Sequence, residues 1–507
     1  MIKINISEYF LETVSRFPDK IAVKEGNETI TFSDLYKRAN KIAQSILGNC
    51  DKVNQPIGVF LPKSINAVAA DMGVTLSGNA YMNMDVKNPE ERLFNILSVI
   101  RPAAIITTSQ FSTILEKIKG FETRLILIDN IDVKIKEVET ISWKKLIDTD
   151  PYCIINTSGS TGTPKGVVLN HKSFIDFMEQ TFDEYGFNEN DSIGSLSPTV
   201  FDIWSFELCV MLAKGSQIVI IPDTFSAFPM KILNLLNENK VSFIFWVPTI
   251  MVNIANMGLL DSVTLPDLRL VWFAGEVFPT KQFNVWYQKL SHTKFANFYG
   301  PIEITLDCVY YNITEPIPDD KPIPIGKPFR NTSILILDED NKEITEEGKD
   351  GELCVRGSSL AMGYYNNPTK TSAAFVQNPL NTSYPEIIYR TGDVVCYDSS
   401  GNMVFKGRRD TLIKHLGYRI ELGEIEHIII NTLKIIENGC VVYNKGKKEI
   451  TVFYESPEEI SPSLFRKEIS KIVPKYMVPT VYIHEVEMKR NTNGKIDRLY
   501  YNNFVNL

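Results

Sequence analysis

The feature that most constrains the fold of this chain is a repeated alternation of short apolar runs with helix-like segments. Several runs are continuous and rich in Val, Ile and aromatic residues, which suits strands buried on both faces: 215–223, 241–249, 268–276 and 293–301. Helical periodicity alternates with such runs, for example at 31–48, where Ser33 stands as a candidate cap. The alternation predicts an α/β fold with a largely parallel sheet and flanking helices. Ligands of such sheets bind beyond the carboxyl ends of the strands.

A chain of 507 residues is too long for a single hydrophobic core, so we expect at least two domains. The later part of the sequence also differs from the earlier part in its pattern of expected elements. From about residue 316 the sequence breaks into short β segments, and its final part has a helix, hairpin and helix pattern: 427–433, 438–455 and 463–473. We therefore expect a large N-terminal domain at 1–407, which includes a small β-rich part, and a small α+β domain at 411–507. The charged turn 408–410 is the expected boundary.

Composition limits the class of protein. Hydrophobic residues make up 44% of the chain and charged residues 22%, as in ordinary globular proteins. The formal net charge of −8 argues against nucleic acid and anionic membranes as partners. Seven cysteines without a CxxC pair indicate reduced, mostly buried thiols. The N-terminus lacks the apolar region of a signal peptide and no run reaches membrane-spanning length, so we expect a cytoplasmic protein.

Residues 157–166, TSGSTGTPKG, combine three glycines with hydroxyl side chains and Lys165. Glycines let backbone amides approach an anion closely, hydroxyls add donors, and the lysine supplies a mobile positive charge. The segment predicts a phosphate-binding loop, although most Gly/Ser/Thr loops are flexible surface turns. It is not a Walker A loop, because Gly166 stands where that motif needs Ser or Thr.

Three further segments carry residue types suited to nucleotide chemistry. In NFYGPIEIT, Tyr299 is able to stack on a purine and Glu303 to bind a magnesium ion that bridges phosphates. In YRTGDVV, Asp393 at a strand end is able to accept both ribose hydroxyls. Lys495 stands in a Gly-Lys turn near the C-terminus. Each feature alone is more often structural, because aromatic-Gly-Pro turns and solvated lysines are common.

Taken in order, these segments resemble the motif set of the adenylate-forming (ANL) superfamily. The motifs run from residue 17 to residue 498: FPDKIAV, LSGNAYMNMD, TSGSTGTPKG, FDIWSFE, NFYGPIE, GELCVRG, YRTGD, GRRD with GYRIELGEIE, and NGKIDR. Within this superfamily, the motif sequences resemble those of stand-alone amino-acid adenylation domains of nonribosomal peptide synthetases and of D-alanine–carrier protein ligases. The resemblance implies an AMP-forming ligase that uses ATP and Mg²⁺.

The resemblance also implies roles for residues by position. The nucleotide would be held by a set of residues along the motifs: Thr157, Ser158, Ser160, Thr161 and Lys165 at the phosphates, Tyr299 at adenine, and Asp393 with Arg408 at the ribose. Glu303 would bind Mg²⁺, and Asp410 would be the hinge of a mobile C-terminal lid. Lys495 would bridge the substrate carboxylate and the α-phosphate.

The implied chemistry fits these residue types. A substrate carboxylate attacks the α-phosphorus of ATP and gives an acyl-adenylate and pyrophosphate, so catalysis consists of positioning and of charge neutralisation by Mg²⁺ and Lys495. A thiol then attacks the adenylate, which requires the mobile lid to rebuild the site. No GxSxG or HExxH motif offers a competing chemistry.

The motif FDIWSFE indicates the kind of acid. Asp202 aligns with the aspartate that pairs with the substrate ammonium in family members that activate amino acids. The other pocket-lining positions carried over are Ile203, Phe206, Phe245, Trp272, Ala274, Phe298, Leu306 and Asp307. Large apolar residues leave little space, which favours Ser, Ala or Gly. Asp307 is able to accept a serine hydroxyl or to pair with a second amine.

Other substrates and functions stay open as alternatives. One alternative is a D-alanine–carrier protein ligase for teichoic acid, although Ala274 stands where D-alanine ligases typically have cysteine. A β-amino acid such as β-alanine would also still reach Asp202. No DxGGxS signature follows Lys495, so we expect the acceptor phosphopantetheine to belong to a separate carrier protein, with coenzyme A as competitor. An acyl- or aryl-CoA synthetase would give Asp202 no role. Ile302 replaces the usual threonine of YGPTE, which leaves a non-catalytic nucleotide-binding relative as the last alternative.

Overall fold

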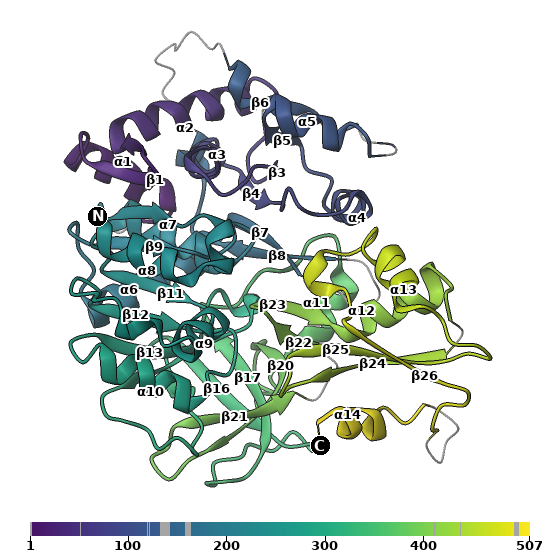
Figure 1. Cartoon of the computed structure of the whole chain (residues 1–507). Coiled ribbons are helices and arrows are strands. Elements are labelled where there is room, and N and C mark those ends of the chain that lie inside the picture. The colour runs from purple at the N-terminus through teal and green to yellow at the C-terminus, as the bar shows by residue number, and fades with distance from the viewer. Residues whose placement is uncertain are drawn as a thin grey trace.

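The computed structural model describes residues 3–50, 52–118, 120, 122–131, 142–157, 164–408, 412–436, 438–490 and 496–506. Sheets with flanking helices make up the N-terminal part, and strand-rich parts follow towards the C-terminus (Figure 1). The predicted α/β class is therefore confirmed. Six of the seven cysteines are buried and all are free thiols. Among the described residues, no helix combines the length and apolar character that crossing a bilayer requires.

A nine-stranded sheet forms the base of the candidate site. Its strand order is β15 (Lys327–Pro328), β14 (Val309–Ile313), β13 (Lys294–Tyr299), β12 (Leu270–Phe273), β11 (Phe243–Trp246), β9 (Ser192–Ser195), β10 (Gln217–Ile220), β1 (Ile21–Glu25) and β2 (Glu28–Thr31). The strands from β13 to β1 are parallel, and the three edge strands β14, β15 and β2 are antiparallel. Strands β11 and β12 are buried along their whole length, as their unbroken apolar runs predict, and β9 is also buried although its sequence is Ser-Ile-Gly-Ser.

A second sheet of seven strands lies above the first in Figure 1. Its order is β18 (Gly363–Tyr364), β8 (Lys165–Asn170), β7 (Pro151–Thr157), β4 (Ala80–Asn83), β3 (Pro56–Val59), β5 (Ala104–Thr107) and β6 (Leu125–Leu127). One large core joins residues of both sheets with the helices α1 (Ile6–Arg16), α2 (Phe32–Leu47), α3 (Ile65–Leu76), α6 (His171–Tyr185) and α7 (Asp202–Lys214). Helices α8 (Pro229–Glu238), α9 (Pro248–Asn256) and α10 (Thr280–Lys289) form a separate core on the other face of the nine-stranded sheet. Helices α4 (Glu90–Ile100) and α5 (Ser109–Leu115) cover the second sheet.

The third sheet is antiparallel and lies in the region where the sequence predicts short β segments, from about residue 316. It contains β16 (Thr332–Leu337), β17 (Gly351–Gly357), β20 (Ile387–Tyr397), β19 (Phe375–Gln377) and β21 (Met403–Arg408), with α11 (Pro368–Ala374) before β19. Strand β21 ends at Arg408, the first residue of the expected boundary at 408–410.

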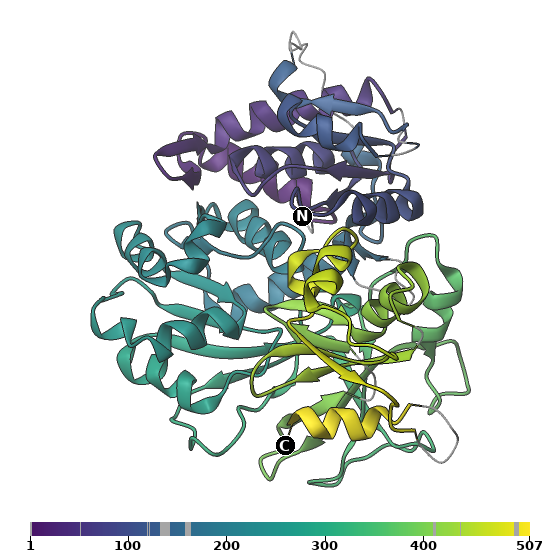
Figure 2. The same ribbon diagram turned by 45° about the vertical axis from the view of Figure 1, so that its right-hand side comes forward.

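Residues 412–506, called the C-terminal part below, have their own cores. A hairpin comes first, then a three-stranded sheet with helices: β22 (Leu412–His415), β23 (Tyr418–Glu421), α12 (Leu422–His427), β24 (Asn438–Asn444), β25 (Glu449–Glu455), α13 (Pro462–Ile469), β26 (Val481–Glu485) and α14 (Arg498–Asn506). The predicted hairpin at 438–455 is β24 and β25. In both views the yellow-green C-terminal part lies against the rest of the molecule (Figures 1 and 2).

Two local predictions were wrong. Helix α2 is capped by Thr31, whose side chain accepts a hydrogen bond from the Asp34 amide, and not by Ser33. Asp393 does not end a strand but lies inside β20, beside Gly392 with φ +72°. The pairing of β20 with β17 and with β21 is irregular around this glycine, so a bulge holds Asp393 within a longer strand.

Candidate active site

The candidate residues converge beyond the carboxyl ends of β9, β12 and β13, where a parallel sheet offers a ligand site. Tyr299 ends β13, Glu303 lies in the turn after it, and Asp202 begins α7 after the loop that follows β9. The β22–β23 hairpin of the C-terminal part enters the same space. Its residues Lys414 and Arg419 stand directly opposite each other in the hairpin register.

Glu303 is fully buried and receives two hydrogen bonds. Tyr364 Oη donates to its Oε1 at 2.8 Å, and Arg419 Nη1 donates to its Oε2 at 2.5 Å. Burial by itself would raise the pKa of Glu303, but the Arg419 and Lys165 cations lower it to about 2. The Lys165 ammonium lies 5.0 Å from the centroid of the Tyr364 ring, and burial lowers the pKa of this lysine. Glu303 is therefore an ionised carboxylate at neutral pH.

Lys165 is positioned by strand pairing. It begins β8 opposite Thr157, which ends β7, and the Thr157 hydroxyl donates to the Lys165 carbonyl at 3.5 Å. The residues expected to bind phosphate between them, Ser158, Ser160 and Thr161, lie outside the described residues. The described ends of the loop thus come together beside Glu303.

Tyr299, Asp393 and Arg408 form a second polar group. The Tyr299 hydroxyl donates to Asp393 Oδ2, and Arg408 Nη1 donates to Asp393 Oδ1 at 2.5 Å. Strand pairing creates this arrangement, because Asp393 on β20 stands opposite Arg408 on β21. The Asp393 amide also donates to Thr391 Oγ1 at 3.0 Å. The Asp393 carboxylate is thus held by a phenol and a guanidinium.

Two further carboxylates, Asp202 and Asp307, lie close enough for the charge of Asp202 to act on Asp307. Burial raises the pKa of Asp202 to about 6, against hydrogen bonds such as that from the Ile203 amide at 3.0 Å. Burial, and then the Asp202 charge, raises the pKa of Asp307 well above its usual range. The chain turns sharply before Asp307, where Thr305 and Leu306 have φ of +53° and +65°. This turn passes so close to Gly300 that a Cβ there would lie 2.2 Å from the Leu306 carbonyl oxygen.

The apolar positions predicted for the substrate pocket pack against one another. Trp272 is fully buried, and its ring centroid lies 4.3 Å from that of Phe298 and 5.5 Å from those of Phe206 and Phe245. Ile203, Ala274 and Leu306 are also buried. The structure therefore brings the predicted pocket residues together beside Asp202 and Asp307, on the side of the nine-stranded sheet that α6 and α7 cover.

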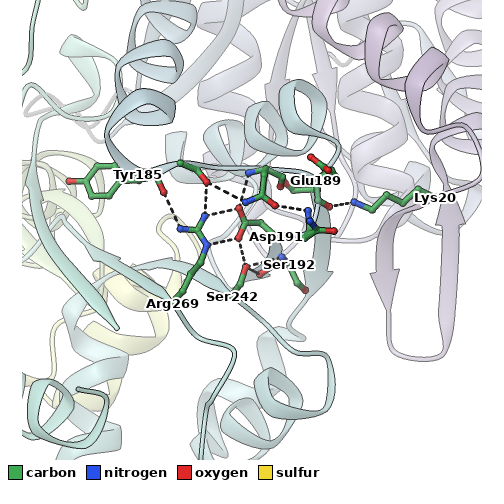
Figure 3. Close-up of polar contacts among 11 residues, drawn as sticks. Lys20, Tyr185, Glu189, Asp191, Ser192, Ser242 and Arg269 are labelled. Atoms are coloured by element: carbon green, nitrogen blue, oxygen red, sulfur yellow. Dashed lines mark hydrogen bonds and ion pairs between the residues drawn. The ribbon is translucent and has the colours of Figure 1, made fainter. Parts of the chain in front are cut away.

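A charged network lies at the N-terminal ends of β9, β11 and β12, opposite to the ends that meet the candidate site (Figure 3). Arg269 donates to both oxygens of Asp191, at 2.8 and 2.7 Å, and to the Tyr185 carbonyl at 3.0 Å. Ser242 donates to Asp191 Oδ1 at 2.7 Å. The Tyr185 ring packs 4.7 Å from Trp272. The network thus joins β9, β11 and β12 to the end of α6 and holds Tyr185 against the pocket.

Sequence reasoning missed Lys414 and Arg419 as site residues. Both lie within the motif region IKHLGYRIE, where two cations interrupt an apolar strand pattern. Cross-strand pairing places them on one face of the hairpin, so this pattern was the available signal.

Two expected residues cannot be placed. Asp410 and Lys495 lie outside the described residues. Next to Lys495, the backbones of Arg490 and Ile496 pair, and Ile496 packs with Met488 and Tyr501 inside the C-terminal part. Lys414 and Arg419 are thus among the described C-terminal residues that lie at the site.

Several contacts hold the C-terminal part in this orientation. Arg92 on α4 and Glu424 on α12 form a buried ion pair at 2.5 Å. The Gly417 amide donates to Glu276 Oε1 at 2.7 Å, and the rings of Phe201 and Tyr418 lie 5.0 Å apart.

Comparison with known proteins identifies the family. The AMP-binding enzyme family matches residues 10–365. Zwittermicin A synthase ZmaJ of Bacillus cereus is 30% identical over 97% of this chain and 94% of its own length. Tyrocidine synthase 1 of Brevibacillus parabrevis is also 30% identical over 97% of this chain, which spans only 44% of that relative.

Solved structures share the fold. Holo-PA1221, an NRPS protein containing adenylation and PCP domains, matches with a TM-score of 0.84 at 21% identity, over 98% of this chain and 84% of its own. The adenylation domain AlmE of Vibrio cholerae, in complex with glycyl-adenosine-5′-phosphate, matches with a TM-score of 0.82 at 21% identity, over 99% and 98%. The chain therefore belongs to the AMP-binding enzyme family, in the adenylate-forming superfamily whose relatives include nonribosomal peptide synthetase adenylation domains.

Proposed function

We propose that this protein activates a small amino acid with ATP and transfers it to the phosphopantetheine thiol of a separate carrier protein. One observation carries the proposal: Asp202 and Asp307 lie beside the buried aromatic residues of the predicted substrate pocket, and Tyr299, which directly follows Phe298 of that cluster, donates to Asp393 beside Arg408. A carboxylate in such a pocket suits a substrate ammonium, and the second group suits a nucleoside. The two together suit an aminoacyl-adenylate.

The proposed roles follow the motif positions. The nucleotide is held by Thr157, Ser158, Ser160, Thr161 and Lys165 at its phosphates, by Tyr299 at adenine, and by Asp393 with Arg408 at the ribose. Lys495 joins the substrate carboxylate to the α-phosphate during adenylation. The lid domain at 411–507 turns about 408–410, with Asp410 as hinge.

Magnesium fits Glu303, with one condition. In the described residues no group of three or more His, Cys, Asp or Glu side chains gathers as a metal site. Mg²⁺ with a nucleotide needs only one or two protein carboxylates, because phosphates and waters complete its shell. Glu303 is ionised, but Tyr364 and Arg419 engage both of its oxygens. Metal binding therefore requires Arg419 to leave, which a turn of the lid domain accomplishes. The ion would neutralise charge on the phosphates of ATP.

The orientation of the C-terminal part supports a second, thiol-dependent step. A cavity of about 510 Å³ lies between the two parts of the molecule. Its wall includes Phe201 and Val247 from the N-terminal part, and Leu416 and Tyr476 from the C-terminal part. Because Phe201 directly precedes Asp202, a thiol on a long arm that entered this cavity would arrive beside the activated carboxyl group.

The side chains that line the predicted pocket favour a small substrate. The aromatic rings around Trp272 occupy the space beyond Asp202. AlmE, which shares the fold, was solved with a glycyl adenylate. Asp307 supplies a second carboxylate, so serine and 2,3-diaminopropionate belong in the test beside glycine and alanine.

The test is ATP–pyrophosphate exchange with L- and D-Ala, L-Ser, Gly, β-Ala, 2,3-diaminopropionate, bulky amino acids, and fatty and aryl acids. We expect exchange with one small amino acid, lost in Lys495→Ala and in Asp202→Ala and kept in Asp183→Ala, an exposed aspartate of α6. Exchange only with fatty or aryl acids, unaffected by Asp202→Ala, would assign a CoA synthetase instead. ATP binding without any exchange would assign a non-catalytic relative.

A further inference from the structure

Asp71 is a buried acidic residue that the proposed roles leave unused. It is the only charged residue of α3, whose other residues are mostly apolar and buried. Asp71 Oδ2 accepts two hydrogen bonds, from Trp204 Nε1 at 2.8 Å and from Asn83 Nδ2 at 3.1 Å. Asp71 Oδ1 is also buried, and no residue in the described part of the chain donates a hydrogen bond to it. Burial raises the pKa of Asp71 to about 7, against these two hydrogen bonds.

This arrangement costs stability and supplies a directed contact. A buried oxygen without a hydrogen-bond partner destabilises a fold, and an apolar side chain at the same place would avoid that loss. The contact joins α3 and β4, which carry Asp71 and Asn83, to α7, which carries Trp204. It links residues that are 133 positions apart in the sequence. The presence of Asp71 is therefore explained better by this contact than by packing.

The contact reaches the helical turn that begins with Asp202. Trp204 follows Asp202 by two residues, at the start of α7. This helix begins without a hydrogen-bonded cap from the N-cap side chain, because Phe201 at that position has no acceptor atom. The residue after Trp204, Ser205, accepts a hydrogen bond from Tyr81 Oη on β4 at 2.7 Å. Side chains of α3 and β4 therefore hold the first turn of α7 in place.

Asp202 and Trp204 lie on opposite faces of this turn. Helical periodicity places Asp202 and Phe206, four residues apart, on one face and Trp204 on the other. Phe206 packs against Trp272 of the predicted pocket, with the ring centroids 5.5 Å apart. The hydrogen bond from Trp204 to Asp71 thus holds the turn on the side away from the pocket. Asp71 is able to act on Asp202 through α7 without a contact of its own to the substrate.

We propose that Asp71 is a positioning residue for the amino-acid substrate: through Trp204 it fixes the place where Asp202 meets the substrate ammonium. The proposal rests on the proposed function. Asp202 has to hold the ammonium so that the substrate carboxylate lies at the α-phosphorus of ATP, and a displacement of about 1 Å costs up to about 10²-fold in rate. The nucleotide groups Tyr299 and Asp393 belong to β13 and β20, not to α7. Loss of the contact should therefore affect the amino acid and not ATP.

The experiment measures the KM for the amino acid and the KM for ATP by pyrophosphate exchange in the full chain. We expect Asp71→Leu to raise the KM for the amino acid about 10–10²-fold and to change the KM for ATP by less than about threefold. Asp71→Asn, which keeps an oxygen for Trp204, should recover much of the loss. The control is Thr75→Val, because Thr75 is buried on the same helix and its hydroxyl donates within α3, to the Asp71 carbonyl at 2.8 Å.

Two further measurements test whether Asp71 acts through Trp204. Trp204→Phe keeps an aromatic ring but lacks the N–H donor, so it should raise the KM for the amino acid as Asp71→Leu does. The double variant should then be no worse than either single variant, because both changes remove the same hydrogen bond. Amide hydrogen exchange over residues 201–206, measured without substrates, should be faster in Asp71→Leu than in the wild type and in Thr75→Val.

Three results would overturn the role of Asp71. One is an unchanged KM for the amino acid in Asp71→Leu, and another is an equal rise of both KM values, which would mean a general structural role. The third is additive effects of Asp71→Leu and Trp204→Phe. If Asp71→Leu does not fold, the same KM comparison with Asp71→Asn and Trp204→Phe decides. Failure of the proposed function is a separate outcome, because the wild type would then show no pyrophosphate exchange with any amino acid, while amide hydrogen exchange would still report on the first turn of α7.

Discussion

Asp202 should reduce the stability of the empty protein, and replacing it by asparagine tests this directly. Burial of this carboxylate raises its pKa from the ordinary 3.8 to about 6. A raised pKa means that the folded state binds a proton more tightly than the unfolded state between these values. Folding stability therefore falls as pH rises through this range, by about 1.4 kcal/mol for each unit. The ionised side chain should thus cost about 3 kcal/mol at neutral pH.

The variant Asp202→Asn removes the charge and keeps an oxygen that accepts from the Ile203 amide. At pH 7.5, without substrates, we expect its free energy of unfolding to exceed that of the wild type by up to about 3 kcal/mol, seen as a Tm higher by a few degrees. The gain should shrink as pH falls from 6 and be absent at about pH 4, where both side chains are neutral. Calorimetry at a series of pH values measures it, with Asp183→Asn as the exposed control.

The same change should remove activity, because an amide cannot pair ionically with an ammonium. In the wild type, the KM for the amino acid should rise about tenfold per pH unit below 6, as Asp202 becomes protonated. An Asp202→Asn variant that is less stable than the wild type at pH 7.5, or equally stabilised at every pH, would refute the reasoning.

Three other predictions follow from specific contacts. Arg92→Met or Glu424→Gln breaks the buried ion pair, at about 3–5 kcal/mol, so each should slow thiol transfer but not pyrophosphate exchange, and the double variant should recover part of the loss. Trp272→Ala opens the pocket, so exchange should extend to bulky amino acids such as Leu, while calorimetry shows a loss of about 3–5 kcal/mol. Asp191→Ala removes the partner of Arg269 and should lower stability by about 1–3 kcal/mol, read as a lower Tm with an unchanged KM.

Much of the fold could be predicted because it depends on local patterns. Unbroken apolar runs gave the buried parallel strands, and the turn between two apolar segments gave the hairpin at 438–455. Errors were also local. Thr31 caps α2 in place of Ser33, two residues away, because either side chain satisfies the same sequence signal. Asp393 lies within β20 because pairing on both sides continues the strand through Gly392, and a bulge of this kind leaves no clear trace in one strand's sequence.

The candidate site was predictable only in part. Motif order led to Tyr299, Glu303, Asp202 and Asp307; in the structure Asp202 lies beside Asp307, and Tyr299 and Glu303 lie in the segment just before Asp307. It did not lead to the hairpin cations, because their roles depend on how the C-terminal part is oriented.

The sequence by itself determined the class of each element and the supply of chemical groups, since periodicity, turn residues and motifs act over a few neighbouring residues. Only the tertiary structure decided which charges meet. Arg419 reaches Glu303 across 116 positions of sequence, and Arg92 reaches Glu424 across 332. Such pairs form where distant segments exclude water together, and the low dielectric there lets nearby cations lower the pKa of a carboxylate, as Arg419 and Lys165 do for Glu303. That condition belongs to the assembled fold and to no segment of the chain alone.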